Sequence, residues 1–463
     1  MRAVFITPLK SDAGFEPMMW LRTQEIIGTL RRLGTNVLPL DLPVASQASE
    51  DTLRAVESFR PQFFLAPNFN YFLKAAHHER SLFARFDIPV VALWDDPLGA
   101  LALYLADIVV GQGLAVDHLH QETLPEVLNK PHLGSSALVW RDVMRHLRRR
   151  IPSLPSPTRG SPRLFQRVMQ DPRLMHFAWD TGHIEATNAL GLTTNRTVRW
   201  VPIPTYAAFL KAGMRQSPGP RVKDVAFCGN VYPSVVKQHA LWANELLRSL
   251  TTIICDKKLN ALHRSVWSVM LEEIEQLPAK VRYAYGLYSE MKPFWDYYLF
   301  AVWQAANTFV RLGLLTKVKH QVSIYGLFAD PQSQQEVQNY PNLLYEGHAH
   351  QFDELPGVFA SVKINICISN GLVYRGVSSK LIDCLASGGF ALTDPKDDLV
   401  RLFGVDVERI VFRTPEELNE KIAYFLARPG ERAEITRELQ KKISERCTLE
   451  NFFTQVLASV RDK

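Results

Sequence analysis

The sequence predicts an α/β fold made of two units, each built around a parallel sheet. Three observations support this prediction: short apolar runs alternate with amphipathic stretches, the alternation stops at a Pro/Gly-rich segment over residues 214–221, and it then starts again. Apolar runs that are separated by helices are typical of parallel strands buried on both faces. The length of 463 residues fits two or three domains, at about 150 residues for each domain.

The composition is that of an ordinary globular protein. Apolar residues make up 47% of the chain and charged residues 22%, so a large core can be buried and wholesale disorder is excluded. The net charge of +6 permits an anionic ligand or a membrane surface and does not require nucleic acid as a partner. Five cysteines lie far apart without a C-x-x-C pair, which argues against a disulfide framework and a structural zinc site.

The first unit is expected over residues 1–215. Its apolar runs predict strands separated by helices, two of which we place at residues 20–33 and 53–59. The first run is too short for the apolar core of a signal peptide and turns polar at Lys10, so we interpret it as a strand and expect a cytoplasmic protein. The predicted strands of this unit are residues 4–6, 36–40, 63–65, 88–94, 108–110, 175–179 and 198–201.

The second unit is expected over residues 222–445 and carries a helical elaboration. A long helical region over residues 234–315 is interrupted by a β-branched run at 251–255, which predicts a strand. The most apolar part, residues 299–315, includes polar side chains at intervals, which favours a buried helix over a membrane span. The predicted strands of this unit are residues 225–228, 322–325, 343–345, 364–366, 390–392 and 410–412.

The best-signalled helix starts at Thr414. A threonine cap, Pro415 at the first helical position and Glu417 at the third form a capping box. Residues 446–463 are predicted to form a C-terminal helix that packs back on the first unit.

The most informative stretch for function follows a predicted strand at residue 370 and starts a short helix near Ser378. The backbone N–H groups at a helix N-terminus, together with the helix dipole, favour a bound anion. Lys380 adds a cation in the first turn, and Asp383 lies on the same helix face, where a carboxylate can accept hydrogen bonds from ribose hydroxyls. The alternative is a capped helix with an ordinary Lys–Asp surface pair.

This stretch resembles the nucleotide-binding end of GT-B glycosyltransferases, in particular the CgeB-like, spore-maturation-type branch. The branch has a serine, a basic residue and an acid, followed by A-x-G-G-F-x-L-T, and here the pattern runs from Ser379 to Thr393. Lys380 and Asp383 stand where the family usually has Arg and Glu, so the charges are kept while reach and bidentate geometry change.

Further motifs of the family occur in the same order along residues 223–445. Over residues 1–215 the resemblance is weak and rests mainly on the strand that ends at Trp94 and is followed by Asp95-Asp96-Pro97. The matching segments of the second unit are residues 224–230, 324–326, 344–359, 365–368 and 414–432.

The resemblance implies two Rossmann-like domains that face each other across a cleft, with the donor nucleotide against the second. It implies a glycosyltransferase that uses a UDP-, GDP- or dTDP-linked sugar, without a metal or other cofactor, and a glycan, lipid-linked or protein acceptor. The diphosphate is expected near Gly229, the base near Gly326 and the ribose at Asp383. The full set of implied nucleotide-binding residues is Gly229, Asn230, Gly326, Gly347, His348, Arg375, Gly376, Ser378, Ser379, Lys380 and Asp383.

The first unit is expected to supply the acceptor site and any general base. Four candidates follow predicted strands, at the edge where sites form in open α/β sheets: Asp12, Asp95, Asp96 and His183. We rank Asp96 and His183 first. An inverting transfer needs such a base, whereas a retaining transfer does not. The alternatives are a loop cap for Asp95 and Asp96 and a surface or core position for the histidine.

The basic run Arg145–Arg150 has two interpretations. It is either a solvated helix end, or a contact with anionic lipid headgroups that would bring the protein to the inner membrane face. No aromatic residues alternate with the arginines, so nucleic acid is not expected. Two other functions stay open: a nucleotide-sugar epimerase on the same fold, and a non-catalytic nucleotide-binding or assembly protein.

Overall fold

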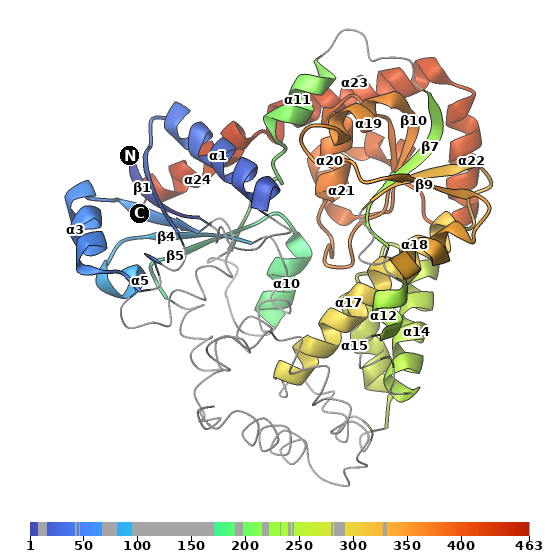
Figure 1. The fold of residues 1–463 in the computed structure, drawn as a ribbon, viewed down its shortest axis with the longest axis horizontal. Helices are drawn as coiled ribbons and strands as arrows, with labels where there is room; N and C mark the ends of the chain where they lie inside the picture. Colours follow the sequence, from blue (N-terminus) through green and yellow to red (C-terminus); the bar gives the residue numbers. More distant parts are fainter. Residues whose placement is uncertain are drawn as a thin grey trace.

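The structure is a computed structural model, and Figure 1 shows two α/β units side by side, with a group of helices below the second unit. The predicted α/β class, with a parallel sheet in each unit, is confirmed. The structure describes residues 1–7, 16–41, 44–45, 47–66, 81–94, 171–189, 198–214, 222–231, 233–238, 242, 245–278, 281, 292–326 and 331–462.

The first sheet has six described strands in the order β2-β1-β3-β4-β5-β6, and its neighbouring strands are paired in parallel. The predicted strand at residues 108–110 lies outside the described residues. The strands are β1 (Arg2–Thr7), β2 (Asn36–Asp41), β3 (Phe63–Ala66), β4 (Val90–Trp94), β5 (Leu174–Ala178) and β6 (Val198–Trp200). The helices of this unit are α1 (Glu16–Arg32), α3 (Glu50–Phe59), α5 (Leu82–Arg85) and α10 (Thr181–Ala189). The next helix along the chain, α11 (Ala207–Gly213), packs on the second unit, whose core includes Phe209.

Helices cover both faces of the first sheet. Successive side chains of a strand point to opposite faces, so neighbouring residues of β1 belong to different cores. Val4 belongs to the core that includes α3 and α5, and Phe5 to the core that includes α1. The second of these cores also contains α24 (Leu449–Arg461), whose Phe453 and Val456 are fully buried. The last helix of the chain therefore packs on the first sheet.

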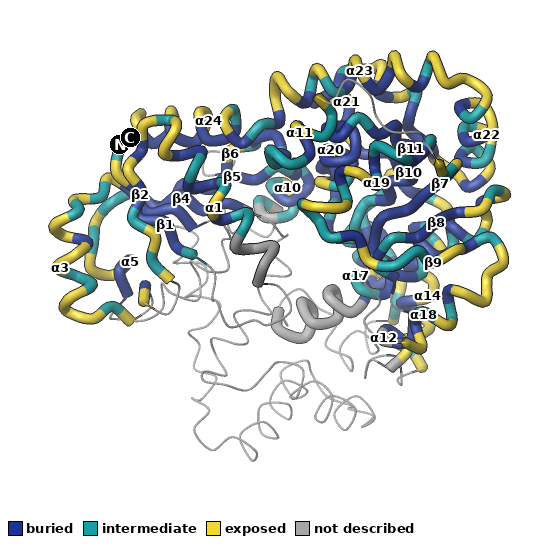
Figure 2. The backbone as a smooth tube through the Cα atoms, turned by 45° about the horizontal axis from the view of Figure 1, so that its top comes forward, coloured by how far each residue is buried: buried dark blue, intermediate teal, exposed yellow. Residues whose placement is uncertain are grey.

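The second sheet has five described strands in the order β11-β10-β7-β8-β9, again parallel. They are β7 (Lys223–Cys228), β8 (Val322–Tyr325), β9 (Leu343–Gly347), β10 (Val362–Cys367) and β11 (Ala391–Thr393). The helices are α12 (Pro233–Gln238), α14 (Glu245–Asn260), α15 (Val266–Gln276), α17 (Lys292–Leu315), α18 (Pro331–Gln338), α19 (Leu355–Ser361), α20 (Ser379–Ala386), α21 (Asp397–Phe403), α22 (Pro415–Leu426) and α23 (Pro429–Arg446), with a 3₁₀ turn at Val405–Ile410. Figure 2 shows that the strands are largely buried while the outer turns of α22 and α23 are exposed.

The strand predicted at residues 251–255 is wrong, because these residues lie inside α14. Leu247, Leu250 and Ile254 are buried on one face of that helix, and the Thr251 hydroxyl donates to the carbonyl of Leu247. Packing along this face overrides the strand preference of the β-branched residues. The strand predicted at 410–412 is reduced to one bridge between Thr393 and Val411.

The capping box of α22 forms in part as predicted. The Thr414 hydroxyl accepts a hydrogen bond of 3.1 Å from the N–H of Glu417. The Glu417 carboxylate reaches back to the N–H of Arg413, at 2.7 Å, rather than to that of the cap residue itself.

The chain crosses between the two units twice, and the crossings run side by side. Thr205 follows β6, and its N–H donates to the carbonyl of Cys447 at 2.7 Å. A parallel bridge joins Thr205 to Thr448, just before α24. None of the described helices is long and apolar enough to cross a membrane.

Candidate functional site

The carboxyl ends of β7, β8 and β9 lie side by side, and each strand end carries a glycine. We call this row of strand ends the edge of the second sheet. Gly326 donates its N–H to Gly347, and Gly229 donates its N–H to Tyr325. A Cβ on Gly326 would lie 2.2 Å from the carbonyl oxygen of Gly229, so the neighbouring backbone requires glycine there. Gly347 has a φ of +109°, which also favours glycine. The structure therefore brings Gly229, Gly326 and Gly347 together.

Lys380 reaches this edge from the first turn of α20. Its Nζ donates to the carbonyl oxygen of Cys228, the last residue of β7, at 2.7 Å. A Cβ on Gly229 would lie 2.7 Å from the ring of Phe227 and 3.0 Å from that Nζ, so the glycine leaves room for both groups. Burial and the neighbouring Arg311 lower the pKa of Lys380 to about 8.

Arg311 is a second cation at the same edge, contributed by α17. Its guanidinium donates to the carbonyl oxygens of Asn230 at 3.2 Å and Ile368 at 3.4 Å. The side chain is buried and lies over the ring of Phe227. Arg311 is one of the polar side chains within the buried helix expected at residues 299–315, and no functional role was predicted for it. The sequence could have indicated this role, because an arginine within a buried helix carries a charge that needs partners.

Together, Lys380 and Arg311 place two positive charges beside the three strand ends. Both are anchored on backbone carbonyls at or just after the ends of β7 and β10, so their positions are set by the sheet. Ser378, the cap residue of α20 and two positions before Lys380, is buried, and Ser379 is exposed. Two cations and a helix start at one sheet edge can hold a doubly charged anion such as a diphosphate.

Asp383 lies one turn further along α20 and is buried. Its Oδ1 accepts a hydrogen bond of 2.7 Å from the hydroxyl of Thr205, in the segment that crosses between the units. Burial raises the pKa of Asp383 to about 7, although Thr205, Arg22 and Lys380 act to lower it. The carboxyl group is therefore tied to the crossing segment in this structure. His348, which follows β9, is exposed.

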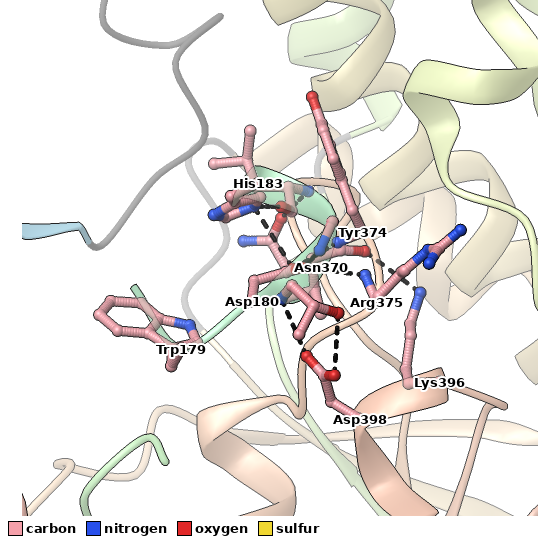
Figure 3. A network of polar contacts seen from close by, with 12 residues as sticks. Trp179, Asp180, His183, Asn370, Tyr374, Arg375, Lys396 and Asp398 are labelled. Atoms are coloured by element: carbon pink, nitrogen blue, oxygen red, sulfur yellow. Dashed lines mark hydrogen bonds and ion pairs between the residues drawn. The ribbon is translucent and has the colours of Figure 1, made fainter. Parts of the chain in front are cut away.

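The loop over residues 370–376, which connects β10 to α20, contacts the first unit (Figure 3). Asp180 at the end of β5 is fully buried. Its Oδ2 accepts a hydrogen bond of 2.7 Å from the N–H of Tyr374, and its Oδ1 accepts one of 3.0 Å from the N–H of Arg375. A Cβ on Gly376 would lie 2.8 Å from the Cβ of Asp180, so Gly376 is required by this contact.

His183 belongs to the same contact and is only 2% exposed. Its Nε2 lies 2.6 Å from the carbonyl oxygen of Leu372 and 3.4 Å from Oδ2 of Asp180. A carbonyl accepts only, so Nε2 carries the proton and donates. In this arrangement the ring holds the loop.

The remaining candidates are placed as follows. The side chain of Arg375 is half-exposed and pairs with Glu185 at 2.6 Å and with Asp397 at 3.3 Å. Asp12, Asp95, Asp96 and the run Arg145–Arg150 lie outside the described residues. In the part of the chain that the structure describes, no three His, Cys, Asp or Glu side chains are grouped to hold a metal ion.

Comparison with known proteins finds a family match that includes both Arg311 and Lys380. Residues 311–458 match a family model described as glycosyl transferase-like, a stretch that begins at Arg311 and includes the loop and α20. No curated protein matches the sequence. The whole chain is similar in structure to sucrose-phosphate synthase from Thermosynechococcus elongatus, at 9% identity and a TM-score of 0.51, covering 100% of this chain and 98% of that one. The fold is GT-B.

Two other solved structures match the chain at lower similarity. A glycosyltransferase from Rickettsia africae has 7% identity and a TM-score of 0.49, covering 100% of this chain and 98% of that one. The Anabaena protein HepE, solved in complex with UDP, has 11% identity and a TM-score of 0.45, covering 100% of both chains. At these identities the GT-B likeness concerns the fold, and the CgeB-like branch stays a prediction.

Proposed function

We propose that the protein transfers a sugar from a nucleotide-activated donor to an acceptor. The observation that carries this proposal is the pair of anchored cations, Lys380 and Arg311, beside the three glycine-bearing strand ends. The pair lies within the stretch that matches the glycosyl transferase-like model. The leaving group of such a transfer is a nucleoside diphosphate, and fixed cations stabilise the charge that develops on it.

The donor would lie along the edge of the second sheet. Lys380 and Arg311 would hold the diphosphate, with the N–H groups that follow Ser378 at the start of α20. Gly326, Gly347 and the exposed His348 would border the base. Asp383 would contact the ribose once its bond to Thr205 is exchanged for a ribose hydroxyl. We propose that transfer needs no metal, because two cations already supply positive charge at the leaving group.

The general base of an inverting reaction would come from the first unit. His183 is a weaker candidate than the sequence suggested, because its Nε2 is engaged by Leu372 and its ring is buried. A base must reach the hydroxyl of the acceptor directly or through one water. We therefore propose Asp96 as the first candidate base, with Asp95 and Asp12 next.

The proposal is tested by incubating the protein with UDP-glucose, GDP-mannose and dTDP-glucose without an acceptor, and following each donor by NMR. A transferase is expected to release nucleoside diphosphate and free sugar slowly. Inversion at one sugar carbon would show an epimerase, and no reaction with nucleotide bound would favour a binding protein. Adding EDTA should leave the rate unchanged.

Two lysine variants show whether the reaction belongs to this site. Lys380→Ala should abolish hydrolysis. Lys363→Ala is the matched control, because Lys363 lies on β10 at the opposite edge of the same sheet and pairs there with Asp224. It should react like the wild type.

A further inference from the structure

Two carboxylates, one from each unit, bind backbone groups of the opposite unit. Asp180 accepts the N–H groups of Tyr374 and Arg375, and Asp398 on α21 accepts both the N–H of Thr181 at 3.0 Å and its hydroxyl at 2.9 Å. Both aspartates are buried. The start of α10 is therefore joined to the second unit by reciprocal contacts, with the loop over residues 370–376 and with α21 (Figure 3).

Glycines on both sides allow the two backbones to approach this closely. A Cβ on Gly182 would lie 2.5 Å from the Cβ of Tyr374, and a Cβ on Gly376 would lie 2.8 Å from the Cβ of Asp180. The N–H of Gly182 also donates to Asp180, at 2.7 Å. The contact is thus built from the backbones of both units around one carboxylate.

A fully buried carboxylate is costly unless its oxygens accept hydrogen bonds. Burial by itself would raise the pKa of Asp180, yet the nearby His183 and the N–H donors of the loop bring it below its ordinary value. The loop thus stabilises the charged form of Asp180. In return, removing the carboxylate would leave several buried N–H groups without their acceptor.

Both units hold the loop. In the second unit, Asn370 accepts the indole N–H of Trp303 on α17, Lys396 donates to the carbonyl of Val373 at 3.2 Å, and the N–H of Asp398 donates to the carbonyl of Arg375 at 3.0 Å. From the first unit, His183 donates to Leu372, and Asp180 accepts the N–H groups of Tyr374 and Arg375 in the second half. That half leads directly into α20 and Lys380.

We propose that Asp180 is a positioning residue that fastens the second half of the loop to the first unit and thereby sets the position of α20 and Lys380. The nucleotide site is then complete only while the two units are in contact at Asp180. The effect of Asp180 on nucleotide binding rests on the proposed function, whereas the contact by which Asp180 fastens the loop does not.

Hydrogen exchange on the full chain tests the fastening without any ligand. In Asp180→Asn, the amides of residues 374–376 and 181–182 should exchange at least about tenfold faster, and more in Asp180→Ala, because asparagine keeps one acceptor oxygen. The matched control is Asp171→Asn, which removes a partly buried carboxylate that pairs with Arg173 before the same strand, β5. Unchanged exchange at 374–376, or equal acceleration throughout β4 and β5, would overturn the proposal.

Nucleotide affinity gives the second readout, with UDP, GDP and dTDP each titrated alone. Asp180→Asn should weaken the binding of whichever nucleotide the wild type binds by about tenfold, while Asp171→Asn leaves it unchanged. Tighter binding would mean that Asp180 competes with the nucleotide for the loop, and unchanged binding that the loop does not set the site. Either result contradicts the positioning role. If the wild type binds none of the three, the proposed function fails, and hydrogen exchange alone decides whether Asp180 fastens the loop.

Discussion

The Nζ of Lys380 lies 2.7 Å from the carbonyl oxygen of Cys228, so the cation at the start of α20 is seated against the end of β7. Burial lowers the pKa of Lys380, and Arg311, which reaches the same edge from a different helix, lowers it further. The charge of Lys380 is therefore poorly compensated in the free protein. A bound diphosphate would supply the missing negative charge.

The pH dependence of nucleotide binding should follow Lys380. Its pKa of about 8 in the free protein means that the ammonium loses its proton as the pH rises above 8. A diphosphate binds the charged form, so the Kd should rise by roughly tenfold per pH unit above that point. Calorimetric titrations from pH 7 to 9.5 measure this. Lys380→Arg should flatten the profile, because arginine keeps its charge, and a flat wild-type profile would refute the role.

Asp383 should lower the free energy of unfolding as the pH rises, whereas a salt-bridged aspartate raises it. Its pKa is about 7 in the folded protein and about 3.9 in an unfolded chain. The fold thus favours the protonated form, and this stabilisation is present below pH 4 and is lost as the pH rises to 7. Asp383→Asn cannot ionise and keeps an acceptor for Thr205.

The advantage of Asp383→Asn over the wild type should therefore grow by about 2–3 kcal/mol in free energy of unfolding between pH 5 and pH 8. Thermal melts at the two pH values measure it. Asp224→Asn is the control, since Asp224 is exposed and pairs with Lys363. An equal pH response in both variants would show that the burial of Asp383 has no such effect.

Gly326→Ala should destabilise the second unit by about 2 kcal/mol or more, because the new Cβ would meet the backbone of Gly229. Gly357→Ala in α19 is the matched control. There a Cβ meets nothing within 4 Å among the described residues, and alanine favours a helix by about 0.5–1 kcal/mol. Denaturant unfolding of both variants should give opposite signs. The same sign would contradict the assigned packing.

Arg375→Ala should change the free energy of unfolding by less than about 1 kcal/mol, since its ion pairs with Glu185 and Asp397 are exposed. Asp180→Ala should cost about 2–4 kcal/mol, because it strips the acceptor from buried N–H groups. Chemical denaturation compares the two. A larger loss in Arg375→Ala would mean that the side chain, and not the backbone, makes the contact.

Local patterns were sufficient to predict most of the fold. Apolar runs such as residues 4–6 and 225–228 mark strands buried on both faces, and the cap at Thr414 marks the start of α22. The strand predicted at residues 251–255 was wrong because these β-branched residues lie on a helix whose buried face is set by packing. Propensity is local, whereas that packing is not.

The candidate site was predictable only in part, for the same reason. Ser378, Lys380 and Asp383 are close in sequence and share a short helix, so their pattern could be read directly. Arg311 meets Lys380 only through the fold. Asp180 and Tyr374 are separated by 194 positions in the chain, and no spacing rule links a carboxylate to backbone N–H groups so far away.

The central claim is that the anchored cations at the edge of the second sheet bind a nucleoside diphosphate. The most direct measurement is the melting temperature of the wild type, Lys380→Ala, Arg311→Ala and the control Lys363→Ala, each with and without UDP, GDP or dTDP. At 100 times the Kd, binding should stabilise the fold by about 2.7 kcal/mol. We predict that at least one nucleotide raises the melting temperature of the wild type and the control but not of the two site variants. No shift of the wild type with any of the three would contradict the claim.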